Sequence, residues 1–101
     1  MDFKVTNGYG LVEIQLQGRF DFAARRAFVA ARDKALAGPA SRIQINFAGV
    51  DYIDSAALGM LLILRERALS SGKSVHLADC SPTIRQLVEI AQFHRLFAFA
   101  A

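Results

Sequence analysis

The chain has 101 residues, of which 53% are hydrophobic and 21% are charged, and its formal net charge is +3. This length supports one core, and the composition is that of a globular domain rather than a disordered chain. The basic residues are scattered rather than gathered in a block, so we expect no direct binding of nucleic acid.

No apolar run approaches the roughly 20 residues that span a membrane, so we expect no membrane association. The N-terminus lacks a basic segment followed by a long apolar one, and we therefore expect no signal peptide. The single cysteine, Cys80, has no internal partner for a disulfide, which suits a reducing compartment. These features predict one cytoplasmic domain over residues 1–101.

The first half of the chain predicts a hairpin, a helix and a strand. Residues 3–5 and 11–17 alternate in polarity, and the Asn7-Gly8 pair between them favours a tight hairpin. Asp21 is a candidate N-cap for a helix over about 22–37, which Gly38 and Pro39 would end. Alternation over residues 43–47 then predicts a third strand.

A second helix is predicted over about 55–70, before Gly72. Asp54 and Ser55 both suit its N-cap, because each side chain can accept a hydrogen bond from a free backbone N–H. Helical spacing turns one set of residues toward the sheet: Ala57, Leu61, Leu64 and Ala68. It turns a second set away from the sheet: Ala56, Gly59, Met60 and Ile63.

The last part of the chain predicts a fourth strand at Val75 and Leu77 and a third helix opened by Ser81-Pro82. Residues 93–97 are expected to form a short turn or strand on the core. A hairpin followed by βαβ units implies an α/β fold with parallel strands and right-handed crossovers. We therefore expect a mixed sheet of four to five strands with three main helices.

Four short motifs occur in order along this chain: Gly18-Arg19-Phe20-Asp21, Ile53-Asp54-Ser55 with Leu58-Gly59, Gly72-Lys73, and Ser81-Pro82. As an ordered set they resemble the STAS domain of bacterial anti-sigma factor antagonists. The resemblance implies a small α/β domain without catalytic activity that is controlled by phosphorylation of one serine.

By position, Ser55 matches the phosphoacceptor of that family, and Asp21 and Asp54 match acids near it. The resemblance implies two partners, an anti-sigma factor that is often itself the serine kinase and a PP2C-type phosphatase. The unmodified form would bind the anti-sigma factor and free a sigma factor. Ala56 and Ala57 depart from the family, which often has Ser or Thr and then Gly there, and Asn46 stands where Asp is common.

Other chemistry has weaker support. A serine hydrolase needs an oriented base, and no spacing connects His76 or His94 with Ser55. Asp21, Asp51 and Asp54 are more typical of helix caps and turns than of a magnesium site, so we expect no metal and no cofactor. The expected partner-binding residues are listed here: Asp21, Asp54, Ala56, Gly59, Met60 and Ile63. The alternative function is a STAS scaffold or small-ligand sensor in a larger signalling complex, and the oligomeric state is expected to be a monomer or a weak dimer.

Overall fold

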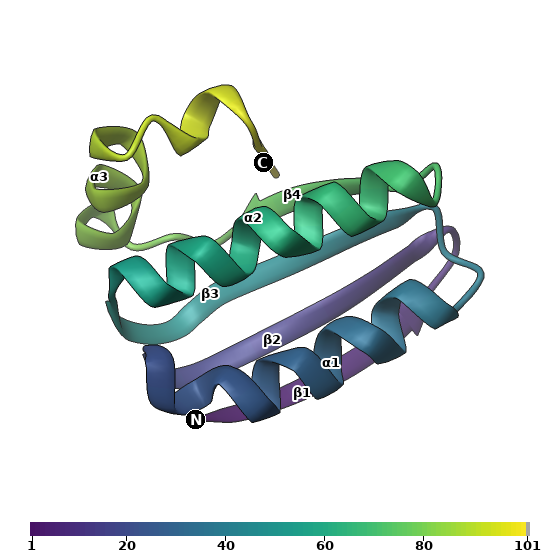
Figure 1. The fold of residues 1–101 in the computed structure, drawn as a ribbon, viewed down its shortest axis with the longest axis horizontal. Coiled ribbons are helices and arrows are strands. Elements are labelled where there is room, and N and C mark those ends of the chain that lie inside the picture. The colour runs from purple at the N-terminus through teal and green to yellow at the C-terminus, as the bar shows by residue number, and fades with distance from the viewer. Residues whose placement is uncertain (101) are drawn as a thin grey trace.

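The computed structural model describes residues 1–100 and contains one five-stranded sheet with three α-helices and two 3-10 turns (Figure 1). The elements in chain order are β1 (Asp2–Gly8), β2 (Leu11–Phe20), η1 (Phe22–Ala24), α1 (Arg25–Ala37), β3 (Arg42–Ile53), α2 (Ser55–Ser70), β4 (Ser74–Ala78), α3 (Pro82–Ile90), η2 (Phe93–Arg95) and β5 (Ala98–Phe99). The predicted mixed sheet with three main helices is confirmed. No helix within residues 1–100 combines the length and the apolar composition needed to cross a membrane.

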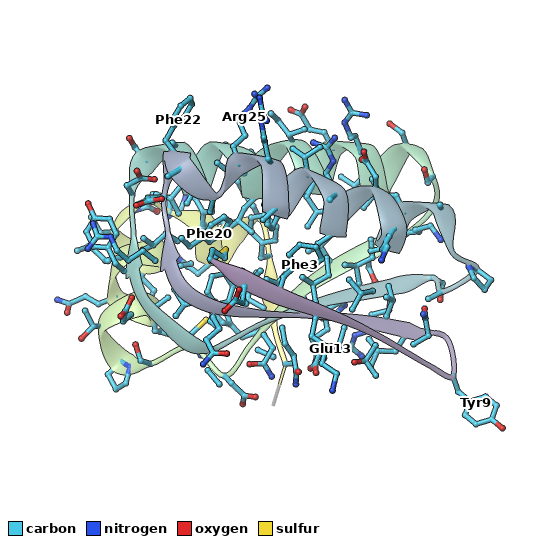
Figure 2. All side chains as sticks on the ribbon, turned by 90° about the horizontal axis from the view of Figure 1, so that it is seen from below. Phe3, Tyr9, Glu13, Phe20, Phe22 and Arg25 are labelled. Carbon is cyan, nitrogen blue, oxygen red and sulfur yellow. The ribbon has the colours of Figure 1, made fainter. Side chains whose placement is uncertain are left out.

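The sheet order follows the chain order from β1 to β5. The β1–β2 pair is antiparallel, and every later pair is parallel. Right-handed crossovers that always advance in one direction place successive helices on the same face, and α1 and α2 lie side by side there (Figure 1). Phe20 points toward the helices, whereas Glu13 points away from them (Figure 2).

The core lies between the sheet and this helical layer. Three phenylalanines from β2, α1 and β3 meet there, with the Phe20 ring centroid 5.0 Å from that of Phe28 and 6.3 Å from that of Phe47. The predicted inward residues of α2 are all fully buried: Ala57, Leu61, Leu64 and Ala68. Burial of apolar area on this scale is the main favourable contribution to folding.

The third strand is longer than the 43–47 predicted from sequence. It runs from Arg42 to Ile53 and pairs with β2 as far as Phe20, through two register shifts. Gly49 lies at the first shift, where an added Cβ would come within 2.9 Å of the Leu16 carbonyl oxygen. These bulges interrupt the alternation of side chains, which hid the second half of the strand.

The predicted helix over 22–37 begins with a 3-10 turn, η1, and becomes α-helical at Arg25. The predicted C-terminal turn or strand is also present, as η2 followed by the two-residue strand β5. Phe93 and Phe97 pack on the core there, with ring centroids 5.6 Å apart.

Gly72 and Lys73 serve the turn between α2 and β4. Gly72 has φ +72°, a conformation that residues with a side chain rarely adopt. The Lys73 ammonium donates hydrogen bonds to the carbonyl oxygens of Gly38 and Ala40, which follow α1. The pair therefore fastens the α2–β4 turn to the loop that leads into β3.

The face of the sheet opposite the helices is polar, and it holds one histidine with a shifted pKa. His76 Nδ1 accepts a hydrogen bond from the Arg42 guanidinium at 3.2 Å. Partial burial and the Arg42 charge lower the pKa of His76 below its usual 6.5. The folded state therefore favours the neutral imidazole more than the unfolded state does.

This shift predicts a loss of stability in mild acid. Because the unfolded chain takes up the His76 proton first, stability is complete above pH ~6.5 and falls as the pH drops toward the lowered pKa. His76→Gln should show a smaller loss than wild type between about pH 7.5 and about pH 5.5 in urea denaturation. Equal losses in wild type and His76→Gln would contradict the assignment.

Candidate functional site

The loops after β2 and β3 lie next to each other because those strands are paired to their ends. Phe20 of β2 is opposite Ile53 of β3, so the residues that follow them, Asp21 and Asp54, emerge side by side. The Asp54 N–H also donates to the Phe20 carbonyl oxygen at 3.3 Å. The sheet therefore brings together two acids that are 33 positions apart in the sequence, which is what the predicted site requires.

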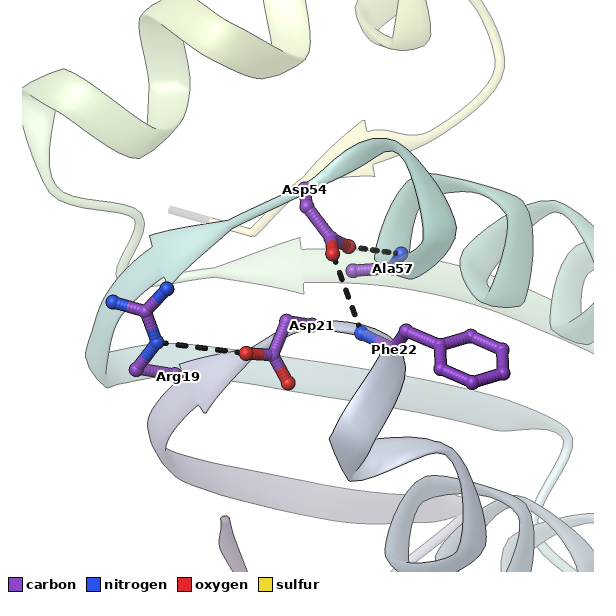
Figure 3. Close-up of polar contacts among 5 residues, drawn as sticks. All are labelled: Arg19, Asp21, Phe22, Asp54 and Ala57. Carbon is purple, nitrogen blue, oxygen red and sulfur yellow. Dashed lines mark hydrogen bonds and ion pairs between the residues drawn. The ribbon is translucent and has the colours of Figure 1, made fainter.

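Asp54 is the N-cap of α2 and also contacts the start of the first helix. Its Oδ1 accepts a hydrogen bond from the Ala57 N–H at 2.9 Å, and its Oδ2 accepts one from the Phe22 N–H at 3.3 Å (Figure 3). Of the two predicted candidates for the N-cap of α2, Asp54 and Ser55, it is therefore Asp54 that caps the helix. One carboxylate links two helix starts.

Asp21 occupies the N-cap position before η1, as predicted, but its side chain makes no capping hydrogen bond. Its carboxylate instead accepts a hydrogen bond from Arg19 Nε at 3.5 Å, while the Phe22 N–H donates to the Asp54 carboxylate (Figure 3). The Arg19 guanidinium also lies over the Tyr52 ring, 4.0 Å from its centroid. Arg19 and Asp21 are too exposed for this pair to add more than ~1 kcal/mol of stability.

Ser55 is exposed and is the first residue of α2. Asp54 Oδ1 accepts from Ala57, and the Leu58 N–H donates to the Asp54 carbonyl oxygen at 3.2 Å, which is the first helical bond. The N–H groups of Ser55 and Ala56 precede those donors and have no carbonyl partner within the helix. An anion on Ser55 would meet these donors and the positive end of the helix dipole.

The predicted outward face of α2 is correct in part. Ala56 and Gly59 are half-buried and Ile63 is 45% exposed, but Met60 is only 9% exposed and belongs to the core. Met60 lies three residues after Ala57 and four before Leu64, so it continues their buried stripe. The prediction that Met60 points away from the core is therefore wrong.

The site also contains a residue that sequence analysis did not select. Phe22 is 67% exposed and sits on η1, beside Asp54. Its position outside the helical stripe of Ala24, Phe28 and Ala31 was the available signal, because a large aromatic residue off the buried stripe faces solvent.

Within residues 1–100, no group of three or more His, Cys, Asp or Glu side chains is placed to hold a metal ion. His76 Nδ1 is engaged by Arg42, and His94 lies in η2. A depression of about 310 Å³ lies on the polar face of the sheet, and Ser55 is not among its lining residues.

Comparison with known proteins identifies relatives of this chain. The family described as "Mlab, STAS domain" matches residues 10–98. A STAS-domain containing protein of Pseudomonas aeruginosa (strain UCBPP-PA14) is 42% identical over 84 residues, which are 83% of this chain and 82% of that protein.

Solved structures share the fold at low sequence identity. The anti-sigma factor antagonist SpoIIAA, a Bacillus cell fate determinant, is 22% identical and matches over 99% of this chain. Its unphosphorylated form gives a TM-score of 0.74 over 88% of that chain, and its phosphorylated form gives 0.73 over 92%. An anti-sigma factor antagonist from Mycobacterium paratuberculosis, 16% identical, gives 0.85 over 97% of this chain and 83% of that chain.

The two acids of the site should differ in their effect on stability. Asp54→Ala removes the acceptors of two backbone N–H groups and should cost about 0.5–2 kcal/mol. Asp21→Ala removes only an exposed pair and should cost less than ~1 kcal/mol. Asp54→Asn keeps one oxygen that can accept from Ala57, so it should fall between wild type and Asp54→Ala. Urea denaturation of the four proteins measures the order, and a larger loss for Asp21→Ala than for Asp54→Ala would refute it.

Proposed function

Because the chain belongs to the STAS domain family, we propose that it is a phosphorylation-switched binding module acting as an anti-sigma factor antagonist. The unphosphorylated form binds an anti-sigma factor or serine kinase and so frees a sigma factor. The kinase transfers the γ-phosphoryl group of ATP to Ser55 Oγ, which loses its proton as ADP leaves, and the domain is then released. A PP2C-type phosphatase hydrolyses the phosphate and restores the hydroxyl.

The exposure of Ser55 at the first position of α2 is the observation on which this proposal rests. A kinase can reach the hydroxyl there without unfolding the helix. The N–H groups of Ser55 and Ala56 can then donate hydrogen bonds to the oxygens of the negatively charged phosphate.

The proposed docking face consists of Asp21, Asp54, Ala56, Gly59 and Ile63. Small residues near the start of α2 allow a partner to approach the helix backbone, and Ile63 adds an apolar contact one turn further along. Such a face favours a protein partner over a small ligand, because it is a helix surface of small side chains with one exposed apolar residue.

The energies are sufficient for a switch. Phosphorylation adds about −1.5 to −2 charges. In the free domain, the positive end of α2 stabilises this charge by roughly 0.3–1 kcal/mol. In an apolar interface the same group loses its water without equivalent partners, and the neighbouring Asp21 and Asp54 carboxylates repel it. A difference of about 2.8 kcal/mol is enough to weaken binding ~100-fold.

The switch does not require a change of fold. The backbone of this chain matches the unphosphorylated and phosphorylated forms of SpoIIAA about equally well, with TM-scores of 0.74 and 0.73. This supports a mechanism in which charge and local contacts, rather than a rearranged core, decide binding. The ATP-dependent kinase step would place the domain in the cytoplasm. In this proposal the domain is a monomer or weak dimer, and it has no catalytic activity, metal or cofactor of its own.

A second candidate function is a STAS scaffold or small-ligand sensor in a larger complex. The depression of about 310 Å³ on the polar face of the sheet favours it, because its lining includes Lys4, Gln15 and Asn46 as possible ligand contacts. A sensor would show ligand-dependent melting that Ser55 substitutions do not alter. The switch would instead gain the mass of one phosphate on Ser55 when incubated with ATP and lysate of the source organism.

The Ser55 variants should rank in a defined order of affinity for the purified kinase that labels Ser55. Wild type and Ser55→Ala should bind alike, because the cap is Asp54 and the hydroxyl is small. Ser55→Asp adds one charge and should bind more weakly, and phosphoserine should bind ~100-fold more weakly than wild type. Isothermal titration measures this, and tightest binding by phosphoserine would rule out the release mechanism.

Gly59 should matter more to the partner than to the fold. A Cβ added at Gly59 meets nothing within 4 Å, so Gly59→Ala should stabilise the free helix by about 0.5–1 kcal/mol. The same methyl group should weaken binding of the kinase at least ~10-fold if the interface packs against the helix backbone. Ser70→Ala, at the far end of α2, is the matched control and should bind as wild type. Unchanged affinity of Gly59→Ala would remove Gly59 from the docking face.

A further inference from the structure

Phe22 is placed as a binding residue rather than a core residue. Of the eight phenylalanines in the chain, all within the described residues 1–100, it alone is exposed, at 67%. It projects from the helical layer on the side away from the sheet (Figure 2). An isolated exposed aromatic is ordinary, but this one adjoins the proposed switch, since its N–H donates to Asp54.

The backbone that carries Phe22 is held in place on both sides. Its N–H donates to Asp54 Oδ2 at 3.3 Å, and its carbonyl oxygen accepts from the Arg25 N–H (Figure 3). The Ala24 N–H donates to the Asp21 carbonyl oxygen at 3.0 Å, which closes the 3-10 turn. A large aromatic side chain on a fixed backbone loses little entropy on binding, and such residues dominate binding energies.

Asp21 precedes Phe22 and Asp54 accepts a hydrogen bond from its N–H, whereas the charged residues that follow it at the start of α1 are basic. Arg25 and Arg26 lie three and four residues after Phe22 and are exposed, and neither forms an ion pair with any residue from 1 to 100. Arg25 projects to the same side as Phe22 (Figure 2). The nearest exposed acid along α1, Asp33, is already paired with Arg32 at 3.0 Å. An aromatic residue beside unpaired cations is complementary to an apolar pocket with an acidic rim.

We propose that Phe22 is the aromatic anchor with which this domain docks a protein partner, and that Asp54 ties the anchor to the state of Ser55. The partner presents an apolar pocket rimmed by carboxylates that face Arg25 and Arg26. This proposal rests on the function proposed above and adds the residue that supplies affinity.

Phosphorylation acts on this anchor through Asp54. A phosphate on Ser55 stands next to the Asp54 carboxylate in sequence, repels it and competes for the N–H groups at the start of α2. The carboxylate then holds the Phe22 N–H less firmly, so the turn that carries the anchor becomes more mobile. The same phosphate offsets the positive charge of Arg25 and Arg26 and opposes an acidic partner.

Binding of the purified kinase that labels Ser55 tests the anchor. Phe22→Ala should reduce affinity by more than ~30-fold, as loss of a central aromatic contact does. Tyr9→Ala, at the exposed tip of the hairpin, is the matched control and should bind as wild type. Arg25→Glu with Arg26→Glu should weaken binding and reverse its dependence on salt. Thermal melting should show that each variant remains folded.

Failure of the anchor can be distinguished from failure of the switch. If Phe22→Ala binds within about twofold of wild type while Ser55→Asp still releases the kinase, the anchor is refuted and the switch stands. Loss of binding in Ile90→Ala, which removes a 69% exposed residue of α3, with none in Phe22→Ala would also refute it. If neither Ser55→Asp nor phosphoserine alters binding, the proposed function fails as well.

The link through Asp54 can be measured without a partner. Phosphoserine incorporated at position 55 should speed amide hydrogen exchange of Phe22 at least ~10-fold, and Asp54→Ala should have a similar effect. The Ile84 N–H, which donates to the Ser81 hydroxyl at 3.2 Å, is an equivalent capped donor at another helix and should not change. An unchanged exchange rate at Phe22 in the phosphorylated domain would refute the link.

Discussion

The Asp54 carboxylate is the contact on which the arrangement of the site depends. It accepts one hydrogen bond from the start of α2 and one from the turn that opens α1, and no other side chain bridges these two helix starts in residues 1–100. This requires β2 and β3 to end together, which they do because Phe20 is opposite Ile53. Two register shifts bring the strands into that register, and the close approach of Gly49 to β2 allows the first of them. A constraint in the middle of the sheet thus positions residues at its end.

The polar face of the sheet explains one departure from the family pattern. Parallel strands are usually covered on both faces, whereas here one face meets water. Asn46 Nδ2 donates to Glu13 at 3.4 Å and to Asp79 at 2.9 Å, and its Oδ1 accepts from the Ala48 N–H at 2.9 Å. An aspartate could not donate and would face two carboxylates. Asparagine therefore fits position 46 better than aspartate, because it can donate to both neighbouring carboxylates.

Sequence periodicity was sufficient to predict the fold and the buried side of each helix, but it did not predict details that depend on packing. Asp54 and Ser55 have equal preference for an N-cap, and only the position of the η1 backbone makes Asp54 the better choice. Met60 lies at the edge of the α2 stripe, and it is nevertheless only 9% exposed. The outward direction of Phe22, by contrast, agrees with its place off the stripe of Ala24, Phe28 and Ala31, a signal that the sequence contained.

Two departures from ordinary stability rules lie near the proposed switch. Gly59 lies inside a helix where a methyl group would meet open space, and Phe22 leaves most of its ring in water. Each costs the free domain stability that alanine or a polar residue would restore. Both lie close in the chain to Asp54 and Ser55 or in direct contact with them, whereas the core side of α2 has no comparable defect. Natural sequences keep such local costs mainly where a surface serves binding or another function. Gly59 and Phe22 together therefore support a binding surface here more strongly than either residue does alone.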